Sequence, residues 1–102
     1  MSKSSSDFQE FLEQKLGSRN VYFQPPAGVM MGYPAFRFNI ATIDNQNADN
    51  IHYYQKTAYS LTYITEDADD PMVKTIASWQ YCKYDRWYAS DNLNHYVFTI
   101  YF

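Results

Sequence analysis

The sequence predicts an α+β domain: a mostly antiparallel sheet of four to five strands, with an N-terminal helix and a second helix at about 70–79 packed on one face of it. Three observations lead to this fold class. Apolar residues recur at helical spacing near the N-terminus and again after residue 70. Other segments alternate apolar and polar residues, as half-buried strands do. Polar connections rich in Asn and Asp separate several of these segments, which favours antiparallel strands.

The first helix is expected at 6–16. Four apolar side chains share one stripe of it: Phe8, Phe11, Leu12 and Leu16. Ser6, followed three residues later by Gln9, has the spacing of a capping box, in which each side-chain oxygen accepts a hydrogen bond from the other residue's backbone N–H. Gly17 is a natural end for the helix, because glycine adopts the left-handed conformation that terminates helices. Residues 1–5 are polar and are expected to be loose.

Three strands are expected next, at 20–24, 35–43 and 52–65. The first is short, because two prolines that cannot donate to a ladder follow it directly in QPPAG. The other two strands alternate, and each has an apolar face: Phe36, Phe38 and Ile40 in one, Tyr59, Leu61 and Tyr63 in the other. The polar segment 44–50 between them suits a turn. These two strands are therefore predicted to form a hairpin with a long tip.

The second helix is expected to begin at Asp69 or Asp70, either of which can cap it, with Pro71 in its first turn. A short apolar stripe follows, with Trp79 near its end: Met72, Val73 and Ile76. Carboxylates are favoured at the positive N-terminal end of a helix. The acidic run before the helix is therefore interpreted as a cap and not as a metal site.

Two strands are predicted to close the fold, at 80–88 and 95–102, joined by the turn SDNLN. In the last strand both faces carry large groups: Tyr96, Phe98, Ile100 and Phe102 on one, His95, Val97, Thr99 and Tyr101 on the other. Such a strand is expected inside the sheet, with a helix over one face and a neighbouring subunit over the other. Phe102, where the chain ends, is expected to be buried in the fold or against a partner.

Size and composition favour a protein subunit. The 102 residues predict a single domain, 1–102. No segment has the roughly 20 apolar residues of a membrane span, and the N-terminus lacks an apolar signal region, so an intracellular product is expected. The net charge is −3, which argues against tight binding of phosphates. Aromatic residues make up 20% of the chain, and Tyr and Trp are enriched at protein interfaces. The alternative is a monomer whose tyrosines coat an exposed sheet.

The side chains that would carry chemistry are few. The single cysteine, Cys82, cannot form an internal disulfide or build a zinc site. Cys82 and His95 would be a nucleophile and its base only if the fold brought them together. Asp85, Asp91 and His95 could be drawn as a metal site, but their spacing in the sequence matches no known ligand motif. We therefore predict no enzymatic activity, no cofactor and no metal.

A structural interpretation of the same residues is simpler. The side chains of Asp91 and Asn92 are expected to bond their own backbone in a turn. Arg86 is expected to pair with Asp85 or Asp91, and His95 to bond a backbone carbonyl. Four basic residues look scattered between aromatics and acids, which makes nucleic-acid binding a minor alternative: Arg37, Lys56, Lys83 and Arg86.

We therefore expect the functional residues to lie in an interface with another protein. Apolar side chains in the loop QPPAGVMMGYP have no obvious core to fill. The polar tip 44–50 and the residues around the last turn complete the predicted interface. The full set is Pro25, Pro26, Met30, Met31, Tyr33, Asp44, Asn47, Asn50, Arg86, Trp87, Tyr88, Asp91 and His95.

Most of the chain, from about residue 20 to 102, resembles small virion proteins of tailed bacteriophages. The resemblance lies in NVYFQPP, then YPAFRF, then ADN before YSLTYI, and finally YCKYDRWYASDNLNHYVFTIYF. Its type is the tail terminator or tail-completion protein. The resemblance implies a small α+β subunit that forms a homohexameric ring, caps the tail tube and joins it to the head–tail connector and neck proteins.

The resemblance also implies where the protein acts. It would be made in the host bacterial cytoplasm and reside in the tail and neck of the virion. Sheath or other tail proteins would be further partners, and DNA would pass through the ring without specific binding. Three alternatives remain open: a head-closure (stopper) or other neck adaptor, a small non-enzymatic protein-binding module, and, least supported, an enzyme.

Overall fold

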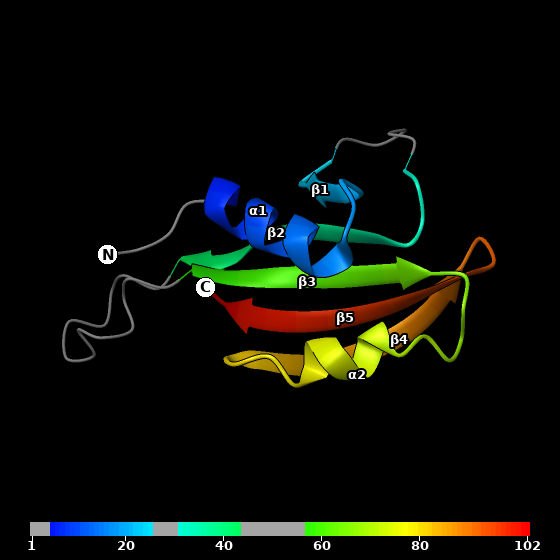
Figure 1. The fold of residues 1–102 in the computed structure, drawn as a ribbon. Helices are drawn as coiled ribbons and strands as arrows, with labels where there is room; N and C mark the ends of the chain where they lie inside the picture. Colours follow the sequence, from blue (N-terminus) through cyan, green and yellow to red (C-terminus); the bar gives the residue numbers. More distant parts are fainter. Residues whose placement is uncertain (1–4, 26–30, 44–56) are drawn as a thin grey trace.

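The protein is a five-stranded sheet with two helices on one face, as seen in the computed structural model (Figure 1). The structure describes residues 5–25, 31–43 and 57–102, with only the backbone at 42 and 43. Its elements are α1 (Ser5–Leu16), β1 (Val21–Phe23), β2 (Ala35–Ile43), β3 (Thr57–Thr65), α2 (Met72–Ala77), β4 (Cys82–Ser90) and β5 (Leu93–Tyr101). The predicted α+β class is confirmed. In the part of the chain that the structure describes, no helix has the length and apolar character to cross a membrane.

The sheet is mixed, in the order β1-β2-β3-β5-β4. β2 pairs antiparallel with β3, β3 with β5, and β5 with β4, so the predicted hairpin of the second and third strands is confirmed. β1 instead runs parallel to β2, with Val21 beside Phe36. The segment between β1 and β2 is thus a crossover and not a hairpin turn, which the sequence did not indicate. The predicted tip 44–50 lies outside the described residues.

Helix α1 begins one residue before the predicted cap, so Ser6 lies inside the helix and the predicted capping box is wrong. The Gln9 amide does not return to Ser6. It donates to Glu13 Oε2 at 3.3 Å and to the Val21 carbonyl at 3.5 Å, which ties the helix to β1. The end of the helix is as predicted: Gly17 has φ 78° and donates its N–H to the Glu13 carbonyl at 2.9 Å.

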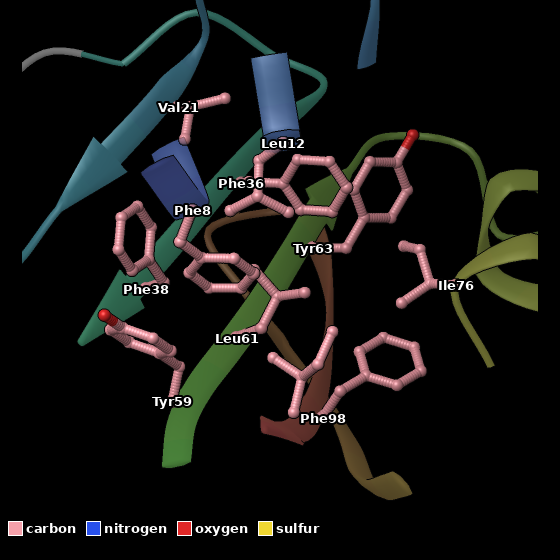
Figure 2. Packing of buried hydrophobic residues seen from close by; sticks show 11 residues of the cluster. Phe8, Leu12, Val21, Phe36, Phe38, Tyr59, Leu61, Tyr63, Ile76 and Phe98 are labelled. Atoms are coloured by element: carbon pink, nitrogen blue, oxygen red, sulfur yellow. The ribbon is translucent and has the colours of Figure 1, made fainter. Parts of the chain in front are cut away.

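The core lies between the two helices and the sheet. Phe8 of α1 is fully buried; its ring centroid lies 4.5 Å from that of Tyr59 and 4.9 Å from that of Phe38, and the three rings gather in Figure 2. The cluster of buried residues is Phe8, Leu12, Val21, Phe36, Phe38, Tyr59, Leu61, Tyr63, Ile76, Phe98 and Ile100. Ile40 continues the predicted apolar face of β2 but is 37% exposed, because it lies toward the end of the strand, beyond the buried Phe38.

Helix α2 is shorter than predicted, since only Met72–Ala77 is helical and Trp79 follows the helix. The N-cap position is Pro71 and not the predicted Asp69 or Asp70, and no side chain caps the helix there. Asp70, one residue earlier, still bonds to the start of the helix. The Asp70 carboxylate accepts hydrogen bonds from Tyr63 Oη at 2.7 Å, Thr65 Oγ1 at 3.0 Å and the Met72 N–H at 3.0 Å. These bonds join α2 to the end of β3. Trp79 packs on α1 instead, 5.3 Å from Phe11 between ring centroids.

The last two strands form a tight hairpin. β4 occupies Cys82–Ser90, two residues later than predicted, and β5 begins at Leu93. Asp91 and Asn92 connect them with φ 54° and 63°, the left-handed conformations of a type I′ turn. β5 lies between β3 and β4, so its predicted place inside the sheet is confirmed. Phe102 is partly buried and its ring lies 4.8 Å from that of Phe8 between centroids.

Candidate interaction surfaces

Strand β4 forms one edge of the sheet and carries a row of exposed aromatic side chains. It pairs only with β5, so the outer side of its main chain is outside the sheet's ladder. Three aromatics at or beside the strand are about half exposed: Tyr81 at 53%, Tyr84 at 47% and Trp87 at 51%. Trp87 Nε1 donates to Asn94 Oδ1 at 3.2 Å, and the Tyr84 ring contacts Phe98 edge-on. These rings are therefore positioned by the fold while much of their surface is open.

A β-bulge divides this edge strand. The register with β5 shifts between Tyr84 and Arg86, which makes Asp85 the extra residue. Its carboxylate accepts a hydrogen bond from Thr99 Oγ1 at 2.6 Å. Bulges and charged side chains limit indiscriminate pairing at a sheet edge. The regular run 86–90 is therefore the part of β4 best suited to accept another strand.

The opposite edge, β1, is less available. It has three residues. The Val21 N–H donates to the Arg19 carbonyl at 2.7 Å, and the Val21 carbonyl accepts from the Gln9 side chain. Because groups of the same chain already bond this end of β1, β4 is the longer and more open of the two edges.

The helix-free face of the sheet is covered by its own side chains around His95. His95 is 9% exposed, and its ring stacks on Tyr88 with centroids 4.6 Å apart. Arg37 Nη2, on the same face but on β2 with β3 and β5 between, donates to Tyr88 Oη at 3.4 Å. The Arg86 guanidinium lies 5.9 Å from the Tyr88 ring centroid. His95 and Val97 are thus buried within the single chain. Long side chains from β2 and β4 therefore cover His95 and Val97 without a neighbouring subunit, whereas Tyr101 on the same face of β5 is 45% exposed.

Of the bonds predicted around the last turn, the one made by His95 is present. His95 Nδ1 lies 3.3 Å from the Leu93 carbonyl, which confirms the expected carbonyl bond and places the ring proton on Nδ1. Burial lowers the pKa of His95, and nearby Arg37 acts in the same direction, against the opposing effects of the Leu93 carbonyl and Asp91. The imidazole is therefore neutral at pH 7.

The predicted ion pair of Arg86 is not formed within the described residues. Arg86 contacts the Tyr88 ring, and the carboxylate of Asp85 is turned to Thr99. The expected side-chain bonds of Asp91 and Asn92 to their own backbone are likewise not among the bonds of the described chain. The left-handed backbone of the two residues makes the turn instead.

The two candidates for nucleophilic chemistry are on opposite faces. Cys82 is paired with Ile100 and packs against the core under the helices, whereas His95 is paired with Tyr88 on the helix-free face. Burial, with a smaller effect of the Asp85 charge, raises the pKa of the Cys82 thiol to about 11. At neutral pH this thiol is protonated, which is unsuited to nucleophilic catalysis. Among the described residues, no group of three or more His, Cys, Asp or Glu side chains is arranged to hold a metal ion.

The loop after β1 is described only at its two ends. Pro25 and Met31 are half-buried, and Tyr33 is exposed. The Gly32 N–H donates to Tyr22 Oη at 3.1 Å, which anchors the returning end of the loop to β1. The remaining predicted interface residues of this loop and of the following tip lie outside the described residues: Pro26, Met30, Asp44, Asn47 and Asn50.

Two open hollows lie between α1 and the α2 region. One, of about 440 Å³, is lined by Phe11 and by the end of β5, and the other, of about 400 Å³, by Tyr63 and Asp70. Lys15 and Trp79 line both, so they separate the two hollows. The lining is mostly aromatic and aliphatic and gathers no set of groups that suggests a reaction.

The structure separates the predicted residues of the last hairpin into two surfaces. Arg86, Tyr88 and His95 meet on the helix-free face, whereas Trp87 points to the helix side, opposite Tyr96. Asp91 is at the hairpin tip. The prediction missed Arg37, which joins the first group, and Tyr81 and Tyr84, which join Trp87. The alternation along 80–88 could have indicated Tyr84, but the partnership of Arg37 depends on the order of strands.

No protein-family model matches this chain, and the comparisons with curated proteins and with solved structures find nothing significantly similar.

Proposed function

We propose that this chain is a structural subunit of a tailed-bacteriophage particle, of the tail-terminator or tail-completion type. It assembles as a closed ring, caps the tail tube and offers the surface that joins the neck. The segments from NVYFQPP to the final strand that resemble such proteins support this proposal. The structural observation that carries it is the open edge strand β4 with its exposed aromatic row.

A closed ring needs an interface between two different surfaces of neighbouring subunits. An edge strand offers main-chain hydrogen bonds to an extended segment of the next subunit. Exposed Tyr and Trp side chains beside that edge supply apolar area, and such residues often dominate binding energy. Val21 of β1 is already bonded within the chain, so β1 is not an open edge for β4 of the next subunit to pair with. In a closed ring β4 would therefore meet a different surface of its neighbour.

The first test is deletion of the gene from the phage that carries it. A terminator predicts tails of abnormal or unregulated length without heads. Full-length tails with unplugged, leaking heads would instead indicate a stopper. Infectious particles formed at normal yield would overturn every structural role proposed for this chain.

The second test locates the contact on β4. Trp87→Ala is expected to weaken ring formation or tube capping about 30-fold, as loss of a hot spot of about 2 kcal/mol would. Tyr101→Ala is the matched control, because Tyr101 is 45% exposed but belongs to the inner strand β5. Native mass spectrometry and electron microscopy of capped tubes provide the measurements. Equal effects of the two substitutions would contradict a contact centred on β4.

A further inference from the structure

The helix-free face gathers basic side chains that are far apart in the sequence. In the register of the sheet, Arg37 is aligned with Thr62, Thr62 with Val97, and Val97 with Arg86, so the two arginines occupy one row across four strands. Both guanidinium groups converge on Tyr88, one at its hydroxyl and one near its ring. Lys83, opposite Thr99, adds a third cation to this face. Within the described part of the chain, none of the three is paired with a carboxylate.

The acidic side chains are mostly elsewhere. Seven lie on α1 or in the connection that leads into α2: Asp7, Glu10, Glu13, Glu66, Asp67, Asp69 and Asp70. On the helix-free face the described carboxylates are Asp85, which is bonded to Thr99, and Asp91 at the hairpin tip. On this face, among the described residues, three cations thus stand against two carboxylates, a net positive charge of one in a chain whose total is −3.

The position of the helices indicates which way this face would turn in a ring. Both helices cover the same side of the sheet (Figure 1). If subunits join through β4, their sheets form a wall around a channel, and the helix layer fits on the outside, where the circumference is larger. The helix-free face then lines the channel. This step rests on the proposed ring.

We propose that the helix-free face, with Arg37, Lys83 and Arg86, is a weak, sequence-independent contact surface for the phosphate backbone of DNA. Charge complementarity selects this occupant, since a guanidinium group matches a phosphate well and Tyr88 holds two of them in place. No side chain needs to read base edges, because phosphate contacts position a duplex without reading its sequence. Three cations per subunit are few enough to let DNA slide and enough to keep it centred.

The test is an amide NMR titration of the purified full chain with a short DNA duplex at low salt. Shifts are expected at β4, β5 and the middle of β2, and not in α1 or α2. Each phosphate contact contributes about 0.9 to the logarithmic salt slope, so tripling the salt should weaken binding about 20-fold for three contacts. For Lys83→Gln with Arg86→Gln, which leaves one contact, the same change should weaken binding only about 3-fold.

A matched control removes the same charge elsewhere. Arg19→Gln with Lys74→Gln changes two exposed cations outside this face and should leave the salt dependence unaltered. Arg37→Lys keeps the charge and should retain binding, and unchanged dispersion of the amide spectrum shows that each variant is folded. Shifts confined to the helices, no shifts at millimolar DNA, or equal losses in the control pair would overturn the proposal.

The two proposals fail separately. Arg37→Gln with Lys83→Gln, which also leaves one contact, should still form rings and cap tubes, because Arg37 is on the inner strand β2 and Lys83 lies outside the run 86–90 of β4. If the protein caps tail tubes but DNA does not contact this face, the proposed DNA contact is refuted and the proposed ring still stands. A chain that binds DNA here but never caps tubes would remove the proposed ring and the channel-facing orientation with it.

Discussion

Asp70 is predicted to be the most sensitive polar residue of the fold. Its carboxylate accepts hydrogen bonds from Tyr63 Oη, Thr65 Oγ1 and the Met72 N–H. Tyr63 and Thr65 are 2% and 3% exposed, so their hydroxyls depend on this partner. Asp70→Ala loses the bond to the Met72 N–H at the start of α2, which, like a cap, is worth about 1 kcal/mol, and two bonds to a charged acceptor, at about 1.5 kcal/mol each. Because the adjoining hollow admits water to Tyr63, we expect a total loss of about 3 kcal/mol.

The assay is urea unfolding followed by tryptophan fluorescence. In thermal unfolding of a domain of this size, the same loss of about 3 kcal/mol in stability would lower Tm by on the order of 15 °C. Asp69→Ala is the control, since Asp69 is the exposed neighbour of the same charge, and it should change stability by less than about 0.5 kcal/mol. Equal losses for the two variants would refute the reasoning, because the effect would then come from local charge and not from the bonds of Asp70.

The same group predicts a dependence on pH. Burial alone would raise the pKa of Asp70, but the hydrogen bonds from Tyr63, Met72 and Thr65 outweigh it and lower the pKa below its usual value. A carboxyl group with a lowered pKa in the folded state contributes stability above its unfolded pKa of about 3.9 and loses it as pH falls through the folded value. The stability difference between the wild type and Asp70→Asn should therefore narrow below about pH 4. A difference that stays constant from pH 7 to pH 3 would contradict this account.

Two further predictions concern the last hairpin. Cys82, with its pKa raised to about 11, should react with iodoacetamide at pH 8 about 100-fold more slowly than an unhindered cysteine, and the rate should recover in denaturant; fast labelling of the folded chain would contradict the burial of this thiol. Asn92→Gly should raise stability by roughly 0.5 kcal/mol in urea unfolding, because glycine adopts φ 63° without steric cost and the resulting Asp-Gly is a preferred pair of a type I′ turn; Ser90→Gly, in the extended strand, should instead lower it.

Local patterns in the sequence were sufficient to predict most of the elements. The stripe of Phe8 and Leu12 indicated α1, and Gly17 its end, since both depend only on residues within a few turns of one another. Asp70 was expected at the start of α2 for the same reason, and it bonds to Met72 there although Pro71 holds the N-cap position. Alternation placed Tyr59, Leu61 and Tyr63 on one face of β3. In each of these cases the deciding interaction is local or follows from the period of the backbone.

The sequence by itself thus determined the fold class, the approximate position of the strands, and which residues share a face of most strands, and it limited the number of strands to four or five. Only the tertiary structure decided that β1 runs parallel to β2, that α2 ends at Ala77, and that Arg37 and Arg86 lie in one row with Tyr88 between them. Strand order is a non-local property: it depends on which apolar faces pack together under the two helices. Because charge is carried on faces and not along the chain, an acidic sequence can present a basic surface once its strands are placed side by side.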